Sequence, residues 1–165
     1  MKQSATLDSS FWINAHRTGL LPYVLARYDL RYPPAVAAEL VERFPSGREF
    51  WRLARAGLLV EVVPTTSQLQ EFGPGEREAI NLALEHQDWV LIIDDQRPYQ
   101  AAARLGLNVL CSPVLTVALA TEGALPTSDA LAILARLAAI RTVSPVLLTA
   151  ALAQLGEWSG HEPRL

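Results

Sequence analysis

Short apolar runs alternate with longer helical stretches along most of this chain. Parallel strands must be joined by long crossover connections, most often helices, so this alternation predicts a parallel sheet covered by helices. The run at residues 90–93 is continuously apolar, as expected for a strand with both faces buried. We therefore expect an α/β fold, specifically a three-layer α/β/α sandwich around a central parallel sheet of about five strands. The expected strands are residues 5–8, 30–32, 58–63, 89–93 and 107–111.

The last part of the chain has a helical pattern only. Residues 128–129 provide an N-cap for one expected helix, and residues 144–145 begin a second. We expect residues 1–125 to form the α/β domain and residues 126–165 to form a C-terminal helical extension packed on the same domain. The apolar residues of this extension exceed what one packed helix stripe needs, which predicts self-association or the docking of a protein partner, and the alternative is that they only pack back on the sheet.

The composition excludes several classes of protein. The 165 residues are 50% apolar and 19% charged, with a formal net charge of −3, which excludes a disordered tail and a histone-like basic protein. Nucleic acid would have to be bound by a local patch rather than by bulk charge. The single cysteine, Cys111, excludes a disulfide framework and a cysteine-rich zinc site. No secretory signal and no apolar stretch that could span a bilayer is readable, so we expect a cytoplasmic protein without membrane contact.

Two of the expected strands end directly on carboxylates. Leu7 is followed by Asp8, and Ile93 is followed by Asp94 and Asp95. Sites in open α/β sheets form outside the carboxyl ends of the strands, so these acids converge if the two strands are neighbours. The alternative is structural, because an aspartate after a strand is also a common turn former or helix cap.

Two glutamates beside apolar helix stripes extend this set. Glu76 lies in the first turn of an expected helix and on the same side as Ile80, where an uncompensated carboxylate is costly. Its alternative role is stabilisation of the helix N-terminus. Glu39 lies beside another apolar stripe, and its alternative role is an i,i+4 pair with Arg43. We expect a different face of the Glu76 helix to be solvated, the face with Glu78, Asn81 and Glu85.

Carboxylates that share one pocket repel each other, and their pKa values rise unless a cation neutralises them. Hard oxygen ligands of this kind select Mg²⁺ or Mn²⁺. A carboxylate-bound metal with open coordination positions suits phosphodiester hydrolysis, because it activates water and stabilises the charge that grows on phosphate oxygens. The set of acids therefore predicts a metal-dependent hydrolase.

The acids lie in four motifs that follow one another along the chain. These are Leu7-Asp8-Ser9-Ser10, Pro34-x-Val36-x-x-Glu39-Leu40, Gly73-x-Gly75-Glu76-x-x-Ala79-Ile80-x-Leu82-Ala83 and Leu91-Ile92-Ile93-Asp94-Asp95. In this order they resemble the PIN domain family, in particular the prokaryotic PIN-like branch whose third acid is a Glu in a Gly-x-Gly-Glu motif. The resemblance continues through residues 101–109 and 113–123, and it covers about residues 5–125.

The resemblance implies a metal-dependent ribonuclease with four acids around Mg²⁺ or Mn²⁺. It assigns the catalytic acids to Asp8, Glu39, Glu76 and Asp95. It assigns metal ligation to Asp8 and Glu76 together with Asp94, Asp95 or both, and the sequence leaves the choice between these two aspartates open. Glu76 stands where the family more usually has an aspartate.

Five further residues are candidates for binding RNA. The resemblance implies that the Ser10 hydroxyl holds a metal-site water or an acid. Arg97 follows the last acid and could contact the scissile phosphate, although an ion pair at the helix start is its alternative role. Arg48, Arg52 and Arg55 recur at i, i+4 and i+7, which places them on one helix side. They could bind RNA phosphates, or they could form a solvated face with a neighbouring glutamate.

The first hypothesis is therefore an Mg²⁺- or Mn²⁺-dependent endoribonuclease that acts on RNA. Many relatives are toxins of toxin–antitoxin pairs, so the resemblance also implies an antitoxin protein as a partner. We further expect a homodimer or a higher homo-oligomer. The alternative is a non-catalytic PIN-like module that binds nucleic acid or a protein. A receiver-like phosphoacceptor domain is disfavoured, because it needs a lysine near the site and the only lysine is Lys2.

Overall fold

Five parallel strands form the central sheet of the computed structural model, which describes residues 1–159. They are β1 (Gln3–Leu7), β2 (Tyr28–Tyr32), β3 (Leu59–Glu61), β4 (Val90–Ile92) and β5 (Val109–Leu110). Their order across the sheet is β3-β2-β1-β4-β5, and every neighbouring pair is parallel. The structure thus confirms the expected α/β/α sandwich with a central parallel sheet.

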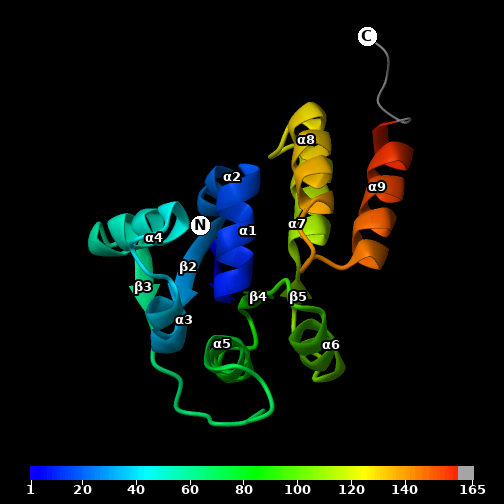
Figure 1. Cartoon of the computed structure of the whole chain (residues 1–165). Helices are drawn as coiled ribbons and strands as arrows, with labels where there is room; N and C mark the ends of the chain where they lie inside the picture. The colour runs from blue at the N-terminus through cyan, green and yellow to red at the C-terminus, as the bar shows by residue number, and fades with distance from the viewer. Residues whose placement is uncertain (160–165) are drawn as a thin grey trace.

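Helices follow each strand and cover the sheet (Figure 1). Before β4 the described chain forms α1 (Ser9–Thr18), α2 (Leu21–Arg27), α3 (Pro34–Glu39), α4 (Pro45–Arg55) and α5 (Pro74–Glu85). After β4 it forms α6 (Gln96–Arg104), α7 (Ser112–Thr121), α8 (Thr127–Ala138) and α9 (Pro145–Ser159). The crossover helices between successive strands are the reason that the sheet is parallel.

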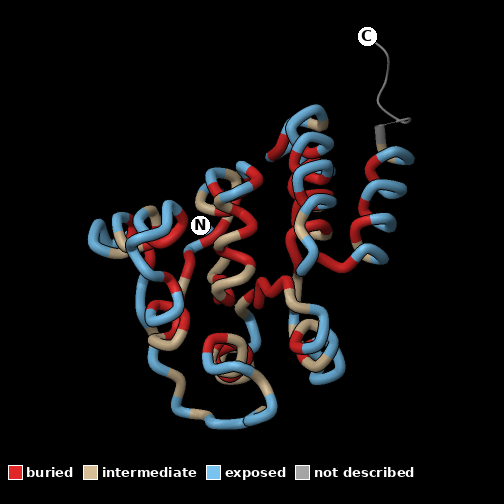
Figure 2. Tube along the Cα trace, in the orientation of Figure 1, coloured by how far each residue is buried: buried red, intermediate tan, exposed pale blue. Residues whose placement is uncertain are grey.

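The sheet is buried between two apolar cores, as the buried central segments in Figure 2 illustrate. Successive side chains of a strand point to opposite faces, and β4 shows this directly. Val90 and Ile92 belong to a large core with α1, α2, α4 and α7. Leu91 and the following Ile93 belong to a smaller core with α5 and α6. This two-sided burial explains why the run at residues 90–93 is apolar at every position.

The strand expected at residues 58–63 is shorter in the structure, because its partner strand ends early. β3 ends at Glu61, and the Val62 N–H makes the last bond of this pair, to the Tyr32 carbonyl at 2.9 Å. Two prolines follow Tyr32, and proline has no N–H to donate to a neighbouring strand. The apolar run therefore continues beyond the sheet, and Val63 is 65% exposed.

The prediction that Glu78, Asn81 and Glu85 lie on a solvated face of α5 is wrong for the central residue and incomplete for the others. Asn81 is 1% exposed and bonds the backbone of Gln68 in both directions, at 3.1 and 3.2 Å. Glu85 accepts from the Thr65 N–H at 2.7 Å, and Glu78 accepts from a backbone N–H in the first turn of α3 at 2.8 Å. These polar side chains hold α3 and the long β3–α5 connection, which no local pattern reveals.

The two last helices pack against α7, and α8 also contacts α1. Leu134, Leu137 and Leu155 are each at most 1% exposed and join the larger core. The final part of the expected extension, residues 160–165, lies outside the described residues. Within residues 1–159, no helix has the length and apolar character needed to cross a membrane.

Candidate functional site

The candidate site lies where the order of the strands reverses. Successive strands run outward from β1 through β2 to β3 on one side, and from β4 to β5 on the other. β1 and β4 are therefore neighbours, with Leu7 paired with Ile92 and the Asp8 N–H donating to the Ile92 carbonyl at 3.3 Å. A crevice forms at such a switch point, outside the carboxyl ends of the two strands. The acids that follow these strands, Asp8, Asp94 and Asp95, are placed at this crevice.

Asp8 is the most deeply buried acid of the site. Its side chain caps α1, with Oδ1 accepting from the Phe11 N–H at 2.9 Å, and the residue is 1% exposed. Its other oxygen, Oδ2, is buried and has no hydrogen-bond partner among the described residues. Burial raises the pKa of Asp8 well above its ordinary range, against the opposing Phe11 N–H bond, and repulsion from Asp94, Glu76 and Glu39 raises it further. The structure thus places a buried carboxylate oxygen among other acids, without a hydrogen-bond partner in the part of the chain that the structure describes.

Asp94 is also buried, but both of its oxygens are occupied. Oδ1 accepts from the Ser112 N–H at 2.6 Å, and Oδ2 accepts from the Ser112 hydroxyl at 2.6 Å and the Asn14 amide at 2.7 Å. Burial raises the pKa of Asp94, while these three hydrogen bonds oppose the shift. Asp94 therefore joins β4 to the first turn of α7 and to α1. The roles of Asn14 and Ser112 could not be predicted from the sequence, because no local pattern marks a polar residue for a partner so far along the chain.

Asp95 and Glu76 lie at the N-terminal ends of two helices and repel each other electrostatically. Asp95 is half-buried and caps α6, where its Oδ1 accepts from the Arg97 N–H at 3.1 Å. Glu76 accepts from the Gly73 N–H at 3.3 Å through Oε2. Burial raises the pKa of Glu76, and repulsion from Asp95 and Glu39 adds to this shift, while the Gly73 N–H and the charge of Arg97 oppose it. Glu76 therefore both caps its helix and lies among the other acids.

Glu39 holds two other elements of the site together. It is the last residue of α3, so the helix ends before Arg43 and no Glu39–Arg43 ion pair forms within the described residues. The Ser9 hydroxyl donates to Oε2 of Glu39, and the Gly75 N–H donates to Oε1 at 3.0 Å. A Cβ at Gly75 would lie 2.5 and 2.8 Å from the two carboxylate oxygens, so only glycine permits this approach. Glycine at position 75 therefore leaves room for the Glu39 carboxylate beside its backbone N–H, a role that could not be predicted from the sequence.

Gly75→Ala is expected to lower the free energy of unfolding by about 1–2 kcal/mol, because it displaces the Glu39 carboxylate from a charge-assisted hydrogen bond. Gly156→Ala is the matched control, since Gly156 also lies within a helix and a Cβ there would meet no described atom within 4 Å. Urea denaturation of both variants measures the difference. Equal stability of the two variants would show that the Glu39–Gly75 contact contributes nothing measurable.

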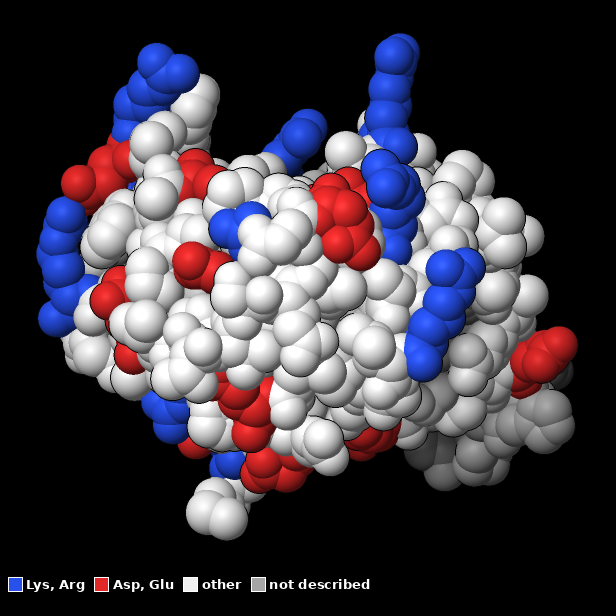
Figure 3. Space-filling model, turned by 90° about the horizontal axis from the view of Figure 1, so that it is seen from below, with Lys and Arg blue, Asp and Glu red and all other residues white. Residues whose placement is uncertain are grey.

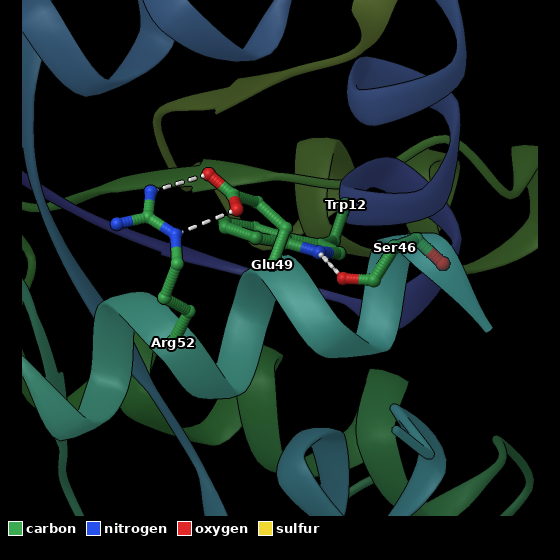
Figure 4. Close-up of polar contacts among 4 residues, drawn as sticks. All are labelled: Trp12, Ser46, Glu49 and Arg52. Carbon is green, nitrogen blue, oxygen red and sulfur yellow. Dashed lines mark hydrogen bonds and ion pairs between the residues drawn. The ribbon is translucent and has the colours of Figure 1, made fainter. Parts of the chain in front are cut away.

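Within residues 1–159, no hydrogen bond or ion pair joins the arginines of α4 to the acids of the site, which are Asp8, Glu39, Glu76, Asp94 and Asp95. Arg52 is paired with Glu49 at 2.7 and 2.9 Å, and Arg55 with Glu42 at 2.7 Å. Figure 4 shows the Arg52–Glu49 pair beside Trp12, a fully buried side chain whose indole N–H donates to the Ser46 carbonyl at 2.8 Å. Arg48 donates to a backbone carbonyl in the α3–α4 connection at 3.3 Å. This side of α4 thus has the arrangement expected for a solvated face with a glutamate neighbour.

The two other candidates for substrate contact lie closer to the acids. Arg97 interacts with Glu76 electrostatically, and its guanidinium carbon is 6.0 Å from the centre of the Phe72 ring. Ser10 is half-buried on α1 and lines a groove beside Asn14. Figure 3 views the molecule from the end toward which the β2 and β3 arrows of Figure 1 point, and it shows acidic side chains in the middle of this face with basic side chains beside them. This end of the molecule therefore carries both signs of charge.

The five acids that lie together, here called the acidic cluster, are Asp8, Glu39, Glu76, Asp94 and Asp95. Within residues 1–159, no three Asp, Glu, His or Cys side chains lie close enough to bind one metal ion directly. The cluster is nevertheless an all-oxygen set with a buried, unbonded oxygen at Asp8. Mg²⁺ keeps several waters and is held by one or two carboxylates, so it needs no cage of protein ligands. The residues therefore fit a hydrated Mg²⁺ or Mn²⁺ ion.

Comparison with known proteins agrees with this architecture. The family model that matches the chain describes a PIN domain, and the match covers residues 5–157. The protein therefore has a nucleic-acid-binding, nuclease-type fold. The chain belongs to the PIN domain family, whose members are generally nucleases. The match extends past the motifs that carry the resemblance, through α8 and most of α9. A search of curated proteins found no match.

Proposed function

We propose that the protein is an endoribonuclease that hydrolyses RNA phosphodiester bonds with Mg²⁺ or Mn²⁺ held at the acidic cluster. The observation that carries the proposal is Oδ2 of Asp8, a buried carboxylate oxygen without a hydrogen-bond partner among the described residues. A buried charge of this kind is stable only when a cation or a proton neutralises it. A bound divalent ion would activate water and stabilise negative charge on the phosphate.

The hydrogen bonds of each acid suggest its role in this reaction. Asp8, Glu76 and Asp95 would hold the metal, because each uses only one carboxylate oxygen within the described chain. Asp94 is a positioning residue in this proposal, since both of its oxygens accept hydrogen bonds. Glu39 would keep the N-termini of α1 and α5 in place and add negative charge to the metal site.

The proposal is tested by cleavage of single-stranded RNA in Mg²⁺, in Mn²⁺ and in excess EDTA. Wild-type protein is expected to cut RNA only with metal, and Asp8→Asn is expected to lower the rate by about a hundredfold or more. Asp88→Asn is the matched control, because Asp88 is an exposed aspartate in the turn before β4, at the N-terminal end of this strand and away from the acids that follow its C-terminal end. Cleavage that persists in EDTA or in Asp8→Asn excludes this mechanism.

A non-catalytic PIN-like module remains the second candidate, because the described acids do not converge on one directly bound ion. Calorimetric titration with Mn²⁺ separates the two functions. The nuclease requires a binding isotherm that Asp8→Asn abolishes and Asp88→Asn retains. A module that binds RNA or a protein without cutting it would show no isotherm that depends on Asp8.

A toxin of a toxin–antitoxin pair also needs a protein partner, and we propose that α8 and α9 provide its docking surface or a dimer interface. Leu131, Val146 and Leu152 on these helices are 48%, 74% and 42% exposed. Apolar side chains grouped on a surface are typical of protein interfaces. Size-exclusion chromatography with light scattering tests self-association, and Leu131→Gln is expected to weaken it.

A further inference from the structure

A groove crosses the exposed side of α1 next to the acidic cluster. Its first part, about 440 Å³, lies between α1 and the α8–α9 connection and includes Ser10, Asn14, Arg17 and Arg141 in its walls. Its second part, about 620 Å³, lies between α1 and the start of α4. Ile13 and Arg17 line both parts, so the two parts adjoin each other at these side chains. This arrangement, here called the α1 groove, agrees with Figure 1, where α1 lies between α4 on one side and α7 and α8 on the other.

The α1 groove is connected to the acidic cluster through Asn14, and Ser10 in its wall is next in sequence to a residue that contacts the cluster. Asn14 lines the groove, and its amide donates to Oδ2 of Asp94 at 2.7 Å. Ser10 lines the groove beside Ser9, whose hydroxyl donates to Glu39. A ligand in the first part of the groove is therefore separated from Asp94 only by the Asn14 side chain.

The charge of the groove is positive, although the whole protein is acidic. None of the described residues that line either part is an aspartate or a glutamate. Within residues 1–159, Arg17 and Arg141 take part in no ion pair or side-chain hydrogen bond, whereas Arg27, Arg52 and Arg55 are each paired with a glutamate. Both arginines are exposed, and they enter the first part of the groove from different elements. Two arginines on opposite sides of a groove suit the phosphates of a polynucleotide.

The second part of the groove is apolar and contains an exposed aromatic ring. Phe44 is 50% exposed, and the guanidinium carbon of Arg43 lies 4.7 Å from its ring centre. His16 lines the same part, and Glu49, which interacts with His16 electrostatically, is itself paired with Arg52 (Figure 4). Unpaired bases stack on such rings, whereas a duplex keeps its bases covered. The aromatic wall therefore favours a single strand.

We infer that the α1 groove binds single-stranded RNA, with Arg17 and Arg141 on phosphates and Phe44 stacked against a base. The groove positions the RNA backbone at the acidic cluster, and the choice of RNA rests on the proposed function. Substrate recognition then belongs to α1, the α8–α9 connection and the start of α4, and the arginine side of α4 takes no part in it.

Fluorescence anisotropy of a short labelled single-stranded RNA, measured in EDTA so that no metal-dependent cleavage occurs, tests this inference. Arg17→Gln and Arg141→Gln are each expected to weaken binding about tenfold and to lower the slope of log Kd against log salt by about 0.7. Phe44→Ala is expected to weaken binding about tenfold without changing that slope, because stacking does not release counterions. The RNA duplex is expected to bind more weakly than the single strand.

Arg104→Gln is the matched control, since Arg104 is an exposed arginine in the last turn of α6 and does not line the groove. Its RNA affinity is expected to equal that of the wild type. The inference is overturned if wild-type protein does not bind RNA, or if Arg17→Gln and Arg141→Gln bind as well as Arg104→Gln. A wild-type protein that binds RNA through the groove but never cuts it would overturn only the proposed nuclease activity. Normal RNA cleavage and RNA binding by the groove variants would overturn only the inference that the α1 groove binds the RNA.

Discussion

Asp8→Asn is expected to make the metal-free protein more stable at neutral pH, by about 1–3 kcal/mol, even though it removes the proposed activity. The wild-type side chain is buried, and its Oδ2 has no partner among the described residues. Asparagine keeps the oxygen that caps α1, since both side chains are good N-caps. It also replaces the charged oxygen by a neutral amide, which removes the repulsion from Asp94, Glu76 and Glu39.

The difference in stability should depend on pH in a defined direction. Burial raises the pKa of Asp8 in the folded protein above its ordinary value of 3.8, so the folded state binds this proton more tightly than the unfolded chain. The corresponding contribution to wild-type stability is complete below that ordinary value and is lost as pH rises through the folded-state pKa. The advantage of Asp8→Asn should therefore grow with rising pH and then level off.

Thermal denaturation across this pH range, in EDTA and with added Mn²⁺, measures both effects. Mn²⁺ should stabilise the wild type and the control Asp88→Asn but not Asp8→Asn, because only a ligand that binds the folded state raises stability. A destabilised Asp8→Asn at neutral pH in EDTA would contradict the expectation, since it would mean that the ionised carboxylate is compensated by the protein itself. The wild-type Asp8 carboxylate is thus expected to lower the free energy of unfolding of the metal-free protein and to be required for cation binding.

Gly47→Ala is expected to lower the free energy of unfolding by about 3 kcal/mol or more, as large steric changes in a packed interior do. A Cβ at Gly47 would lie 2.0 Å from the carbonyl oxygen and 2.6 Å from the carbonyl carbon of Val41. Both are backbone atoms, so the start of α4 would have to move. α4 carries Phe50, whose ring packs edge-on against Trp12 and Tyr32 in the main core. The displacement would therefore reach the core.

Gly156→Ala is the matched control for this prediction. A Cβ at Gly156, within α9, would meet no described atom within 4 Å, and alanine is favoured over glycine inside a helix by about 0.5–1 kcal/mol. Urea denaturation should show a large loss of stability for Gly47→Ala and no loss for Gly156→Ala. Similar midpoints for the two variants would mean that the Val41 carbonyl yields easily. In that case the Gly47–Val41 contact does not fix the position of α4.

Several features of this protein could be predicted from the sequence. The alternation of apolar runs and helical stretches predicted a parallel sheet, because strand and helix periods are local properties of the chain. The positions of Asp8 and of Asp94–Asp95 directly after apolar runs predicted acids at strand ends, and the ordered motifs predicted the PIN domain family, which is confirmed over residues 5–157. Each of these features depends on neighbours within a few residues.

Other features were decided by the tertiary structure alone. The sequence left open whether β1 and β4 are neighbours, and the strand order β3-β2-β1-β4-β5 brings their acids to one crevice. Asp94 accepts hydrogen bonds from Asn14 and Ser112, which lie 80 and 18 residues away in the sequence. Glu39 accepts a hydrogen bond from the N–H of Gly75, which lies 36 residues away. Local periodicity determines which side of an element is buried, but strand order and layer packing determine which distant residues meet there. For that reason the sequence by itself determined which residues are acidic and where the strands end. Only the tertiary structure decided which of these acids are held by hydrogen bonds and that Oδ2 of Asp8 is left without a partner among the described residues.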